Sequence, residues 1–202
     1  MKNFSIEYIK RNNNNVIVII GGDHNVLIND LMKNSRPFGK STIISNSVKY
    51  NEFEQSIIKS VHDNQMNLYR SLEYEEFSKD IYKHFLVLHN YITSPKQLNH
   101  NETKRMFMNS RCLQMSFIVS LKDPLPLKPT SRYNIDFVFI FQETDEVRRK
   151  QLYNYYATII FDNFDSFCEA MDQMKEKTEC LVIYNTAKKC NRSYYIYNVK
   201  IE

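Results

Sequence analysis

The chain has 202 residues and a formal net charge of +4 at pH 7; 43% of its residues are hydrophobic and 25% are charged. This mixture is typical of a globular protein and excludes a disordered one. No apolar run approaches the roughly 20 residues that span a bilayer, and no basic-then-apolar leader opens the chain. We therefore expect a protein that neither enters a membrane nor is secreted, with residues 1–15 as a polar lead-in and residues 16–202 as a single domain.

Residues 11–45 predict the first strands and the first helix of the domain. Residues 11–15 (RNNNN) are turn-prone. Residues 16–20 (VIVII) are apolar without alternation, which predicts a strand buried on both faces, as in a parallel sheet. Gly21 and Gly22 end it, and Asp23 or Asn25 can cap a helix over residues 26–32. Residues 42–44 predict a second strand.

The remaining elements alternate in the same way. Residues 51–83 carry apolar positions three and four apart and predict an amphipathic helix, broken near residues 62–65. Three of the five prolines predict an extended loop over residues 123–129. Further strands are expected over residues 85–88, 115–121, 137–141, 181–184 and 194–199, and further helices over residues 102–109, 146–156 and 164–175. Alternating buried strands and helices predict a three-layer α/β/α domain with a mostly parallel sheet.

The spacing of the cysteines and histidines indicates neither a metal site nor a reactive thiol. The four cysteines lie far apart without a C-x-x-C pair, which favours reduced core thiols. The five histidines share no helical ligand spacing, so we expect no metal site. The cysteines are Cys112, Cys168, Cys180 and Cys190, and the histidines are His24, His62, His84, His89 and His100.

Residues 39–42 (GKST) have the letters that end a phosphate-binding loop, but not its context. The first glycine of G-x-x-x-x-G-K-[ST] would fall at Asn34. The loop must also join a strand to the start of a helix, so that backbone N–H groups converge on the phosphates. Here the preceding residues predict a helix and the following residues predict a strand. We interpret Lys40 as part of an ordinary exposed turn.

The C-terminal half contains five characteristic blocks in order, which are residues 106–111 (MFMNSR), 115–120 (MSFIVS), 133–141 (YNIDFVFIF), 167–173 (FCEAMDQ) and 179–183 (ECLVI). These blocks resemble the genome-packaging ATPases of poxvirus-type and other nucleocytoplasmic large DNA viruses, which belong to the HerA/FtsK superfamily of DNA-translocating motors. The resemblance runs in order from about Lys104 to the end of the chain; between residues 16 and 91 it rests on element order. It implies a P-loop NTPase fold of the RecA/FtsK-like type.

The resemblance also implies where the catalytic parts should lie, and this chain departs from the pattern at each place. Where the family has its phosphate loop, the chain has Gly21, Gly22, Asp23, His24 and Asn25, without a lysine. A carboxylate about 4 Å from a phosphate costs on the order of 4 kcal/mol at an effective dielectric near 20, so the aspartate disfavours nucleotide.

The metal-binding acids and the polar sensor are replaced as well. His89 and Asn90 stand where the family has paired acidic residues, and neither is a good Mg²⁺ ligand. Lys122 stands where the family has a sensor glutamine. Arg111 and Arg132 remain at family-like places; in an active motor they could sense the γ-phosphate, whereas without a phosphate loop we favour salt bridges within or between subunits.

These departures predict a catalytically inactive pseudo-ATPase that needs no cofactor, and the resemblance implies a role in virion assembly or DNA packaging through protein partners. The expected partners are further copies of the chain or an active packaging-ATPase paralogue, in the cytoplasmic viral factory or the virion. One alternative is an active packaging ATPase whose atypical loop binds ATP and Mg²⁺ with help from Lys40 or Lys122. A second alternative is a DNA-binding module whose basic clusters contact DNA phosphates. These clusters are residues 148–150 and the residues Lys188, Lys189 and Arg192. The other interpretation of the same clusters is that they are solvated surface charges.

Overall fold

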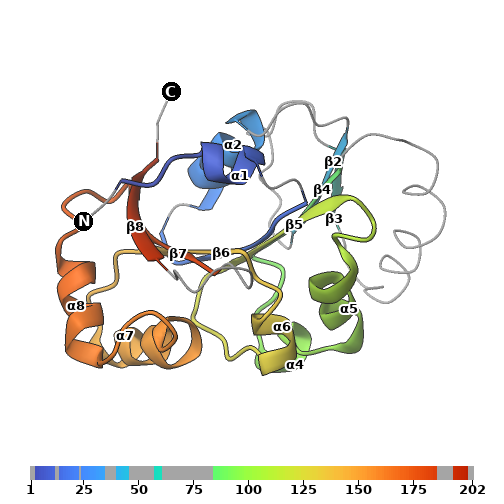
Figure 1. The fold of residues 1–202 in the computed structure, drawn as a ribbon. Helices are drawn as coiled ribbons and strands as arrows, with labels where there is room; N and C mark the ends of the chain where they lie inside the picture. The colour runs from blue at the N-terminus through green and yellow to red at the C-terminus, as the bar shows by residue number, and fades with distance from the viewer. Residues whose placement is uncertain are drawn as a thin grey trace.

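A computed structural model describes residues 3–11, 14–22, 24–34, 40–45, 57–60, 84–185 and 193–199 of the protein. Its centre is an eight-stranded sheet with the order β3-β2-β4-β5-β1-β6-β7-β8 (Figure 1). The strands from β3 to β6 in that order are parallel, and β7 and β8 are antiparallel to their neighbours. The strands are β1 (Val16–Ile20), β2 (Lys40–Ser45), β3 (Ile57–Ser60), β4 (His84–His89), β5 (Met115–Leu121), β6 (Phe137–Phe141), β7 (Glu179–Tyr184) and β8 (Ser193–Asn198).

Helices cover both faces of the sheet, which gives three layers (Figure 1). Helices α1 (Glu7–Arg11) and α2 (His24–Asn34) lie on one face. The larger group lies on the other face and includes one π-helical turn. It consists of α4 (Pro95–Leu98), α5 (Asn101–Asn109), α6 (Pro129–Arg132), α7 (Glu146–Leu152), η1 (Tyr153–Ala157) and α8 (Phe164–Asp172).

The packing of β1 explains why residues 16–20 are apolar at every position and do not alternate with polar residues. Val18 and Ile20 pack into the core under α4 to α8, and Ile17 and Ile19 pack into the core under α1 and α2. All five residues of the strand are buried. Because a strand directs successive side chains to opposite faces, a strand covered on both faces needs apolar residues at every position.

This architecture confirms the predicted fold class, a three-layer α/β/α P-loop NTPase fold with a mostly parallel sheet. The strands expected at residues 16–20, 42–44, 85–88, 115–121, 137–141, 181–184 and 194–199 are all present. Residues 123–128 form the expected extended loop, and the expected helix over residues 146–156 continues from α7 into the π-helical turn η1.

Two local predictions were wrong. Residues 57–60 fall within the predicted amphipathic helix but form β3, beside β2; the apolar pair Ile57 and Ile58 suits either structure. Residues 46–56 and 61–83 lie outside the described ranges. Within the expected loose lead-in, residues 7–11 form α1, and Phe4 is buried against aromatic residues of the sheet. A few apolar side chains are therefore enough to pack this polar segment against the sheet.

Residues 40–42 of the GKST string form the start of β2, in register with the start of β4. They therefore lie at the amino end of a parallel strand and not between a strand and a helix, as a phosphate loop would, and Lys40 is the first residue of β2 rather than part of the expected turn. The end of β1, where a phosphate loop would begin, is at the opposite edge of the sheet. A strand of six residues spans about 20 Å, so Lys40 is far from that edge. Gly39 is outside the described residues.

Candidate functional site

The candidate site lies at the carboxyl edge of the parallel strands. Gly21 and Gly22 follow β1, Asn90 follows β4, and Lys122 follows β5. Strand β1 lies between β5 and β6, both of which come much later in the chain. Ligands of open α/β sheets bind at the carboxyl ends where the strand order changes in this way. The structure thus brings the expected phosphate-loop, metal-acid and sensor positions to one edge, although Asp23 is not among the described residues.

Only three residues separate the end of β1 from the start of α2, and the first two are Gly21 and Gly22. Gly21 and Gly22 have φ angles of +74° and +65°, in the left-handed region that favours glycine. The Gly21 N–H donates to the Leu121 carbonyl oxygen of β5 at 3.1 Å. A phosphate loop holds its ligand with several free backbone N–H groups. Here the Gly21 N–H is not free for a phosphate, because it already donates to Leu121 within the sheet.

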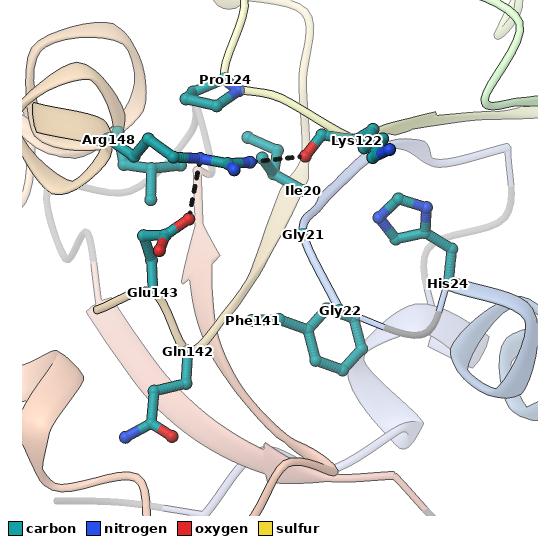
Figure 2. Close-up of a pocket in the computed structure, with 11 residues that line it drawn as sticks. Ile20, Gly21, Gly22, His24, Lys122, Pro124, Phe141, Gln142, Glu143 and Arg148 are labelled. Carbon is teal, nitrogen blue, oxygen red and sulfur yellow. Dashed lines mark hydrogen bonds and ion pairs between the residues drawn. The ribbon is translucent and has the colours of Figure 1, made fainter. Parts of the chain in front are cut away.

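Phe141, the last residue of β6, covers this turn. A Cβ atom added to Gly22 would lie 2.3 Å from Phe141 Cγ and 2.7 Å from its Cβ. The phenyl ring therefore rests directly on the glycine backbone, and Figure 2 shows it beside Gly22, at the turn. Phe141 is 4% exposed. A ring in van der Waals contact with the backbone occupies one side of the turn with apolar surface.

The replaced metal-acid position forms a partly buried polar bridge between α2 and the end of β4. The Asn90 side-chain oxygen lies 3.1 Å from His24 Nδ1, and its amide nitrogen lies 3.3 Å from His89 Nε2. An amide oxygen only accepts and an amide nitrogen only donates. The carboxamide therefore pairs its oxygen with the His24 ring and its nitrogen with the His89 ring. Both imidazoles are buried, at 5% and 4% exposure, with their rings 6.2 Å apart and nearly perpendicular.

The backbone of Asn90 holds this bridge in place. Its φ of +47° is in the left-handed region, which asparagine adopts more readily than most residues. Its N–H donates to both the carbonyl and the hydroxyl oxygen of Ser120 on β5, at 3.2 and 3.1 Å. The carboxamide that stands at the metal-acid position is consequently oriented toward two histidines, and it offers no negative charge to Mg²⁺.

A pocket of about 270 Å³ opens beside the turn (Figure 2). Its lining includes the apolar side chains of Ile20, Pro124, Phe141 and Leu152 and the polar side chains of Lys122, Glu143 and Arg148. Lys122 is exposed at the pocket. Among the described residues no group of three His, Cys, Asp or Glu side chains could hold a metal ion.

Arg148 closes one side of this pocket through contacts within the chain. Its guanidinium pairs with Asp123 at 2.8 Å and with Glu143 at 2.9 Å, and donates to the Lys122 carbonyl oxygen at 3.0 Å. Its neighbours are also engaged: Arg149 pairs with Asp172 at 2.6 Å, and Lys150 Nζ lies 4.2 Å from the centre of the Phe164 ring. The second basic cluster, Lys188, Lys189 and Arg192, is outside the described residues.

Arg111 and Arg132 lie away from the site, toward the amino ends of the strands. Arg111 pairs with Asp136 at 2.7 Å, and the second oxygen of Asp136 accepts from the Val16 N–H, at the start of β1, at 2.8 Å. Arg132 donates to the Leu127 carbonyl oxygen at 3.2 Å. The structure therefore gives Arg111 an ion pair within its own chain and does not bring either arginine to the turn after β1.

Phe141 and Arg148 are the site residues that sequence reasoning missed. The block at residues 133–141 places Phe141 in a strand but does not show that its ring reaches the turn after β1. Arg148 was considered only as part of a basic cluster. The nearby acidic residues Asp123 and Glu143 are its partners, and no local spacing joins them to it.

No protein-family model matches the chain. The sheet order and the layers define the class, which is the P-loop NTPase fold. Among solved structures, the chain is similar to the genome packaging NTPase B204 of Sulfolobus turreted icosahedral virus 2 in complex with AMPPCP, with a TM-score of 0.66, 13% identity, and coverage of 95% of this chain and 100% of that one. It is also similar to ATPases 2 and 3 of EssC from Geobacillus thermodenitrificans, with a TM-score of 0.57, 10% identity, and coverage of 94% and 40%.

The sequence relatives are proteins of large DNA viruses, described as uncharacterized. Protein 088R of Invertebrate iridescent virus 3 is 35% identical over 100 residues, which are 50% of this chain and 38% of that protein. Protein L437 of Acanthamoeba polyphaga mimivirus is 31% identical over 84 residues, which are 42% and 29% of the two chains. The matches thus span well under half of these relatives. Within the described ranges, no helix is both long and apolar enough to cross a membrane.

Proposed function

We propose that this protein is a virus-encoded relative of DNA-packaging motor ATPases that does not hydrolyse ATP, and that it acts in virion assembly or DNA packaging through protein partners. The viral origin of the sequence relatives and the likeness of the fold to a genome packaging NTPase support the kinship. Further copies of the chain or an active packaging ATPase would be its partners, in the viral factory of the host cytoplasm or in the virion.

The contact between Phe141 and Gly22 is the observation that supports inactivity most directly. A phosphate group needs room and free N–H groups at the turn after β1. The ring instead lies against the Gly22 backbone, and the Gly21 N–H is bonded to Leu121. ATP would have to displace an almost fully buried aromatic ring and break a sheet hydrogen bond before its phosphates reached the turn.

The bridge from His24 through Asn90 to His89 supports the same proposal from the metal side. Catalysis of phosphoryl transfer needs a carboxylate that holds Mg²⁺ and orients the attacking water. Asn90 brings no charge to this position, and its carboxamide is used by two buried rings. The metal-acid position at His89 and Asn90 therefore offers no carboxylate to hold Mg²⁺ or to orient the attacking water, so we derive no hydrolytic step.

A thermal-shift titration tests the proposal. We expect millimolar ATP with Mg²⁺ to leave the melting temperature unchanged, whereas a ligand at one hundred times its dissociation constant would stabilise the fold by about 2.7 kcal/mol. A coupled assay of the same preparation should show no Mg²⁺-dependent release of phosphate.

Three variants, Phe141→Leu, Asn90→Asp and His24→Ala, make the test specific. Phe141→Leu keeps an apolar residue on the turn but removes the ring, and Asn90→Asp supplies a carboxylate at the metal-acid position. Turnover by the wild-type protein that Phe141→Leu or His24→Ala altered would contradict the proposal. If turnover in the preparation were the same for all variants, a contaminating ATPase would be its source.

A further inference from the structure

The N-terminal segment, which we define as residues 3–9, packs one phenylalanine among aromatic rings of β6 and β8. Phe4 is 6% exposed. Its ring centre lies between 5.7 and 5.9 Å from the centres of four other rings, at interplanar angles between 63° and 88°. Edge-to-face contacts of this kind stabilise aromatic pairs beyond the area that they bury. The four rings, which we call the aromatic cluster, are those of Phe137, Phe139, Tyr195 and Tyr197.

The aromatic cluster is held in place by contacts that do not involve Phe4. The Phe137 ring stacks on Tyr184 of β7, with ring centres 4.7 Å apart and planes 3° apart. The Tyr197 hydroxyl donates to the Asp30 carboxylate of α2. Strands β6 and β8 are also joined through β7, which pairs with both. Because a preformed site loses little freedom on binding, the cluster suits a phenyl ring whether or not Phe4 supplies it.

The N-terminal segment itself is held by few hydrogen bonds. Within the described ranges, its backbone meets β8 through one bond, from the Phe4 N–H to the Ile196 carbonyl oxygen at 2.8 Å, and one isolated parallel bridge, between Asn3 and Ile196. The Asn15 side chain donates to the Ile9 carbonyl oxygen at 2.9 Å. Helix α1 has five residues, too few for a helix to be stable without its packing. Segments with few hydrogen bonds open more readily than sheet strands, so this segment can leave while the sheet stays paired.

Strand β8 is the last strand of the sheet, and Asn3 and Phe4 lie against its outer edge (Figure 1). The outer edge of a last strand is a surface to which an extended peptide can add. Strand β8 (SYYIYN) has three tyrosines, one isoleucine and no charged residue, a composition that favours strand pairing. A peptide on this edge therefore gains a backbone bond to Ile196 and, at the same position, an aromatic cluster for one side chain.

We propose that the aromatic cluster and the outer edge of β8 form a docking site for an extended, phenylalanine-bearing segment of another protein, which replaces the N-terminal segment. The incoming segment runs parallel to β8, donates its phenylalanine N–H to the Ile196 carbonyl oxygen and places its ring in the cluster. Phenylalanine is favoured over tyrosine because a buried hydroxyl without a partner is costly. The N-terminal segment is then an internal competitor that covers the site until the partner is present.

The partner is recognised by this short motif and not by its fold. A second copy of the chain could offer its own residues 3–9 only by emptying its own aromatic cluster. Such an exchange makes no new contact at this site and still loses the freedom of two separate molecules. A different protein with a free phenylalanine-bearing segment does not have this cost, so we assign the site to such a partner. The inference does not depend on whether the protein binds nucleotide.

Binding of a synthetic peptide tests the proposal. The probe has the sequence of residues 3–9 (NFSIEYI) with a tryptophan added at its carboxyl end; the chain has no tryptophan, so tryptophan fluorescence reports the peptide alone. Phe4→Ala in the full chain empties the cluster, and this variant should bind the probe at least about tenfold more tightly than the wild type, where Phe4 competes. A probe carrying Phe4→Ala should bind at least about tenfold more weakly. A probe N-methylated at its phenylalanine lacks the N–H for Ile196 and should also bind more weakly.

Phe107→Ala is the matched control, because Phe107 is fully buried in the core on the opposite face of the sheet. It should bind the probe no more tightly than the wild type, and circular dichroism should show both variants folded. The wild type at high probe concentration gives a second measurement that does not depend on a variant. A folded Phe4→Ala variant that did not bind, or binding that survived loss of the probe's phenylalanine, would overturn the proposal. So would a wild-type dimer that Phe4→Ala abolished, which would assign the site to a second copy.

Discussion

Replacing Gly22 by alanine is expected to lower the free energy of unfolding by about 3 kcal/mol, because two separate effects add. The φ of +65° costs a residue with a side chain about 1–2 kcal/mol. The new methyl group would also lie 2.3 Å from Phe141 Cγ, and overpacking of this kind typically costs about 1–3 kcal/mol. Urea unfolding followed by circular dichroism measures the loss.

Gly21→Ala is the matched control for this substitution. Gly21 has a similar φ of +74°, but a Cβ atom there would lie 3.7 Å from Phe141, at an ordinary contact distance. Its loss should therefore be limited to about 1–2 kcal/mol of backbone strain. In a Phe141→Ala background, Gly22→Ala should cost no more than Gly21→Ala. Equal losses for the two glycines in the wild-type background would show that Phe141 does not cover the turn.

Replacing Asp136 by alanine should lower the free energy of unfolding by about 2–3 kcal/mol. The change leaves the Val16 N–H without its acceptor at a fully buried position, and an unsatisfied buried donor costs about 1–3 kcal/mol. The ion pair with the half-exposed Arg111 adds less than about 1 kcal/mol. Asp136→Asn should lose less, since its side-chain oxygen can still accept from Val16. Equal losses for the two variants would show that the hydrogen bond to Val16 contributes little.

The same residue gives a pH dependence. Burial raises the pKa of Asp136 above its ordinary value of 3.8, although the bonds from Val16 and Arg111 act in the opposite direction. The folded state then holds the proton more tightly than the unfolded state does, so the contribution of Asp136 to stability is greatest below pH 3.8 and falls as the pH rises through the raised pKa. The difference in unfolding free energy between wild type and Asp136→Asn should shrink over that interval. A difference that grew with pH would contradict the assignment.

Much of the fold could be predicted from sequence because the sheet is covered on both faces. Such strands are continuous apolar runs between turns, and residues 16–20 and 137–141 show this clearly. Strand β3 could not be predicted, since four residues containing Ile57 and Ile58 suit a helix or a strand equally well. Helix α1 was missed because its docking depends on the distant aromatic residues that receive Phe4.

For the site, sequence predicts which residues come to the carboxyl edge, but not how they are used. The local sequence shows where each strand ends, so Gly21, Asn90 and Lys122 could be placed at the carboxyl ends of their strands. The contact of Phe141 with Gly22 depends on the register of β1 with β6, which no local pattern records. The bridge from His24 to His89 likewise depends on the left-handed backbone of Asn90. Arg111 was placed by family likeness, and only the structure shows its partner, Asp136.

The position of β1 in the sheet also constrains how the chain can fold during synthesis. Its two neighbours are β5 and β6, so Val16 pairs with Phe117, 101 residues later, and Ile17 pairs with Phe137, 120 residues later. Such distant pairing makes folding slow and leaves apolar strands unpaired for longer. The segment VIVII leaves the ribosome early and must wait, unpaired and prone to aggregation, until residue 141 has been made. The nascent chain should therefore depend on chaperones more than a protein of this size with local strand pairing does.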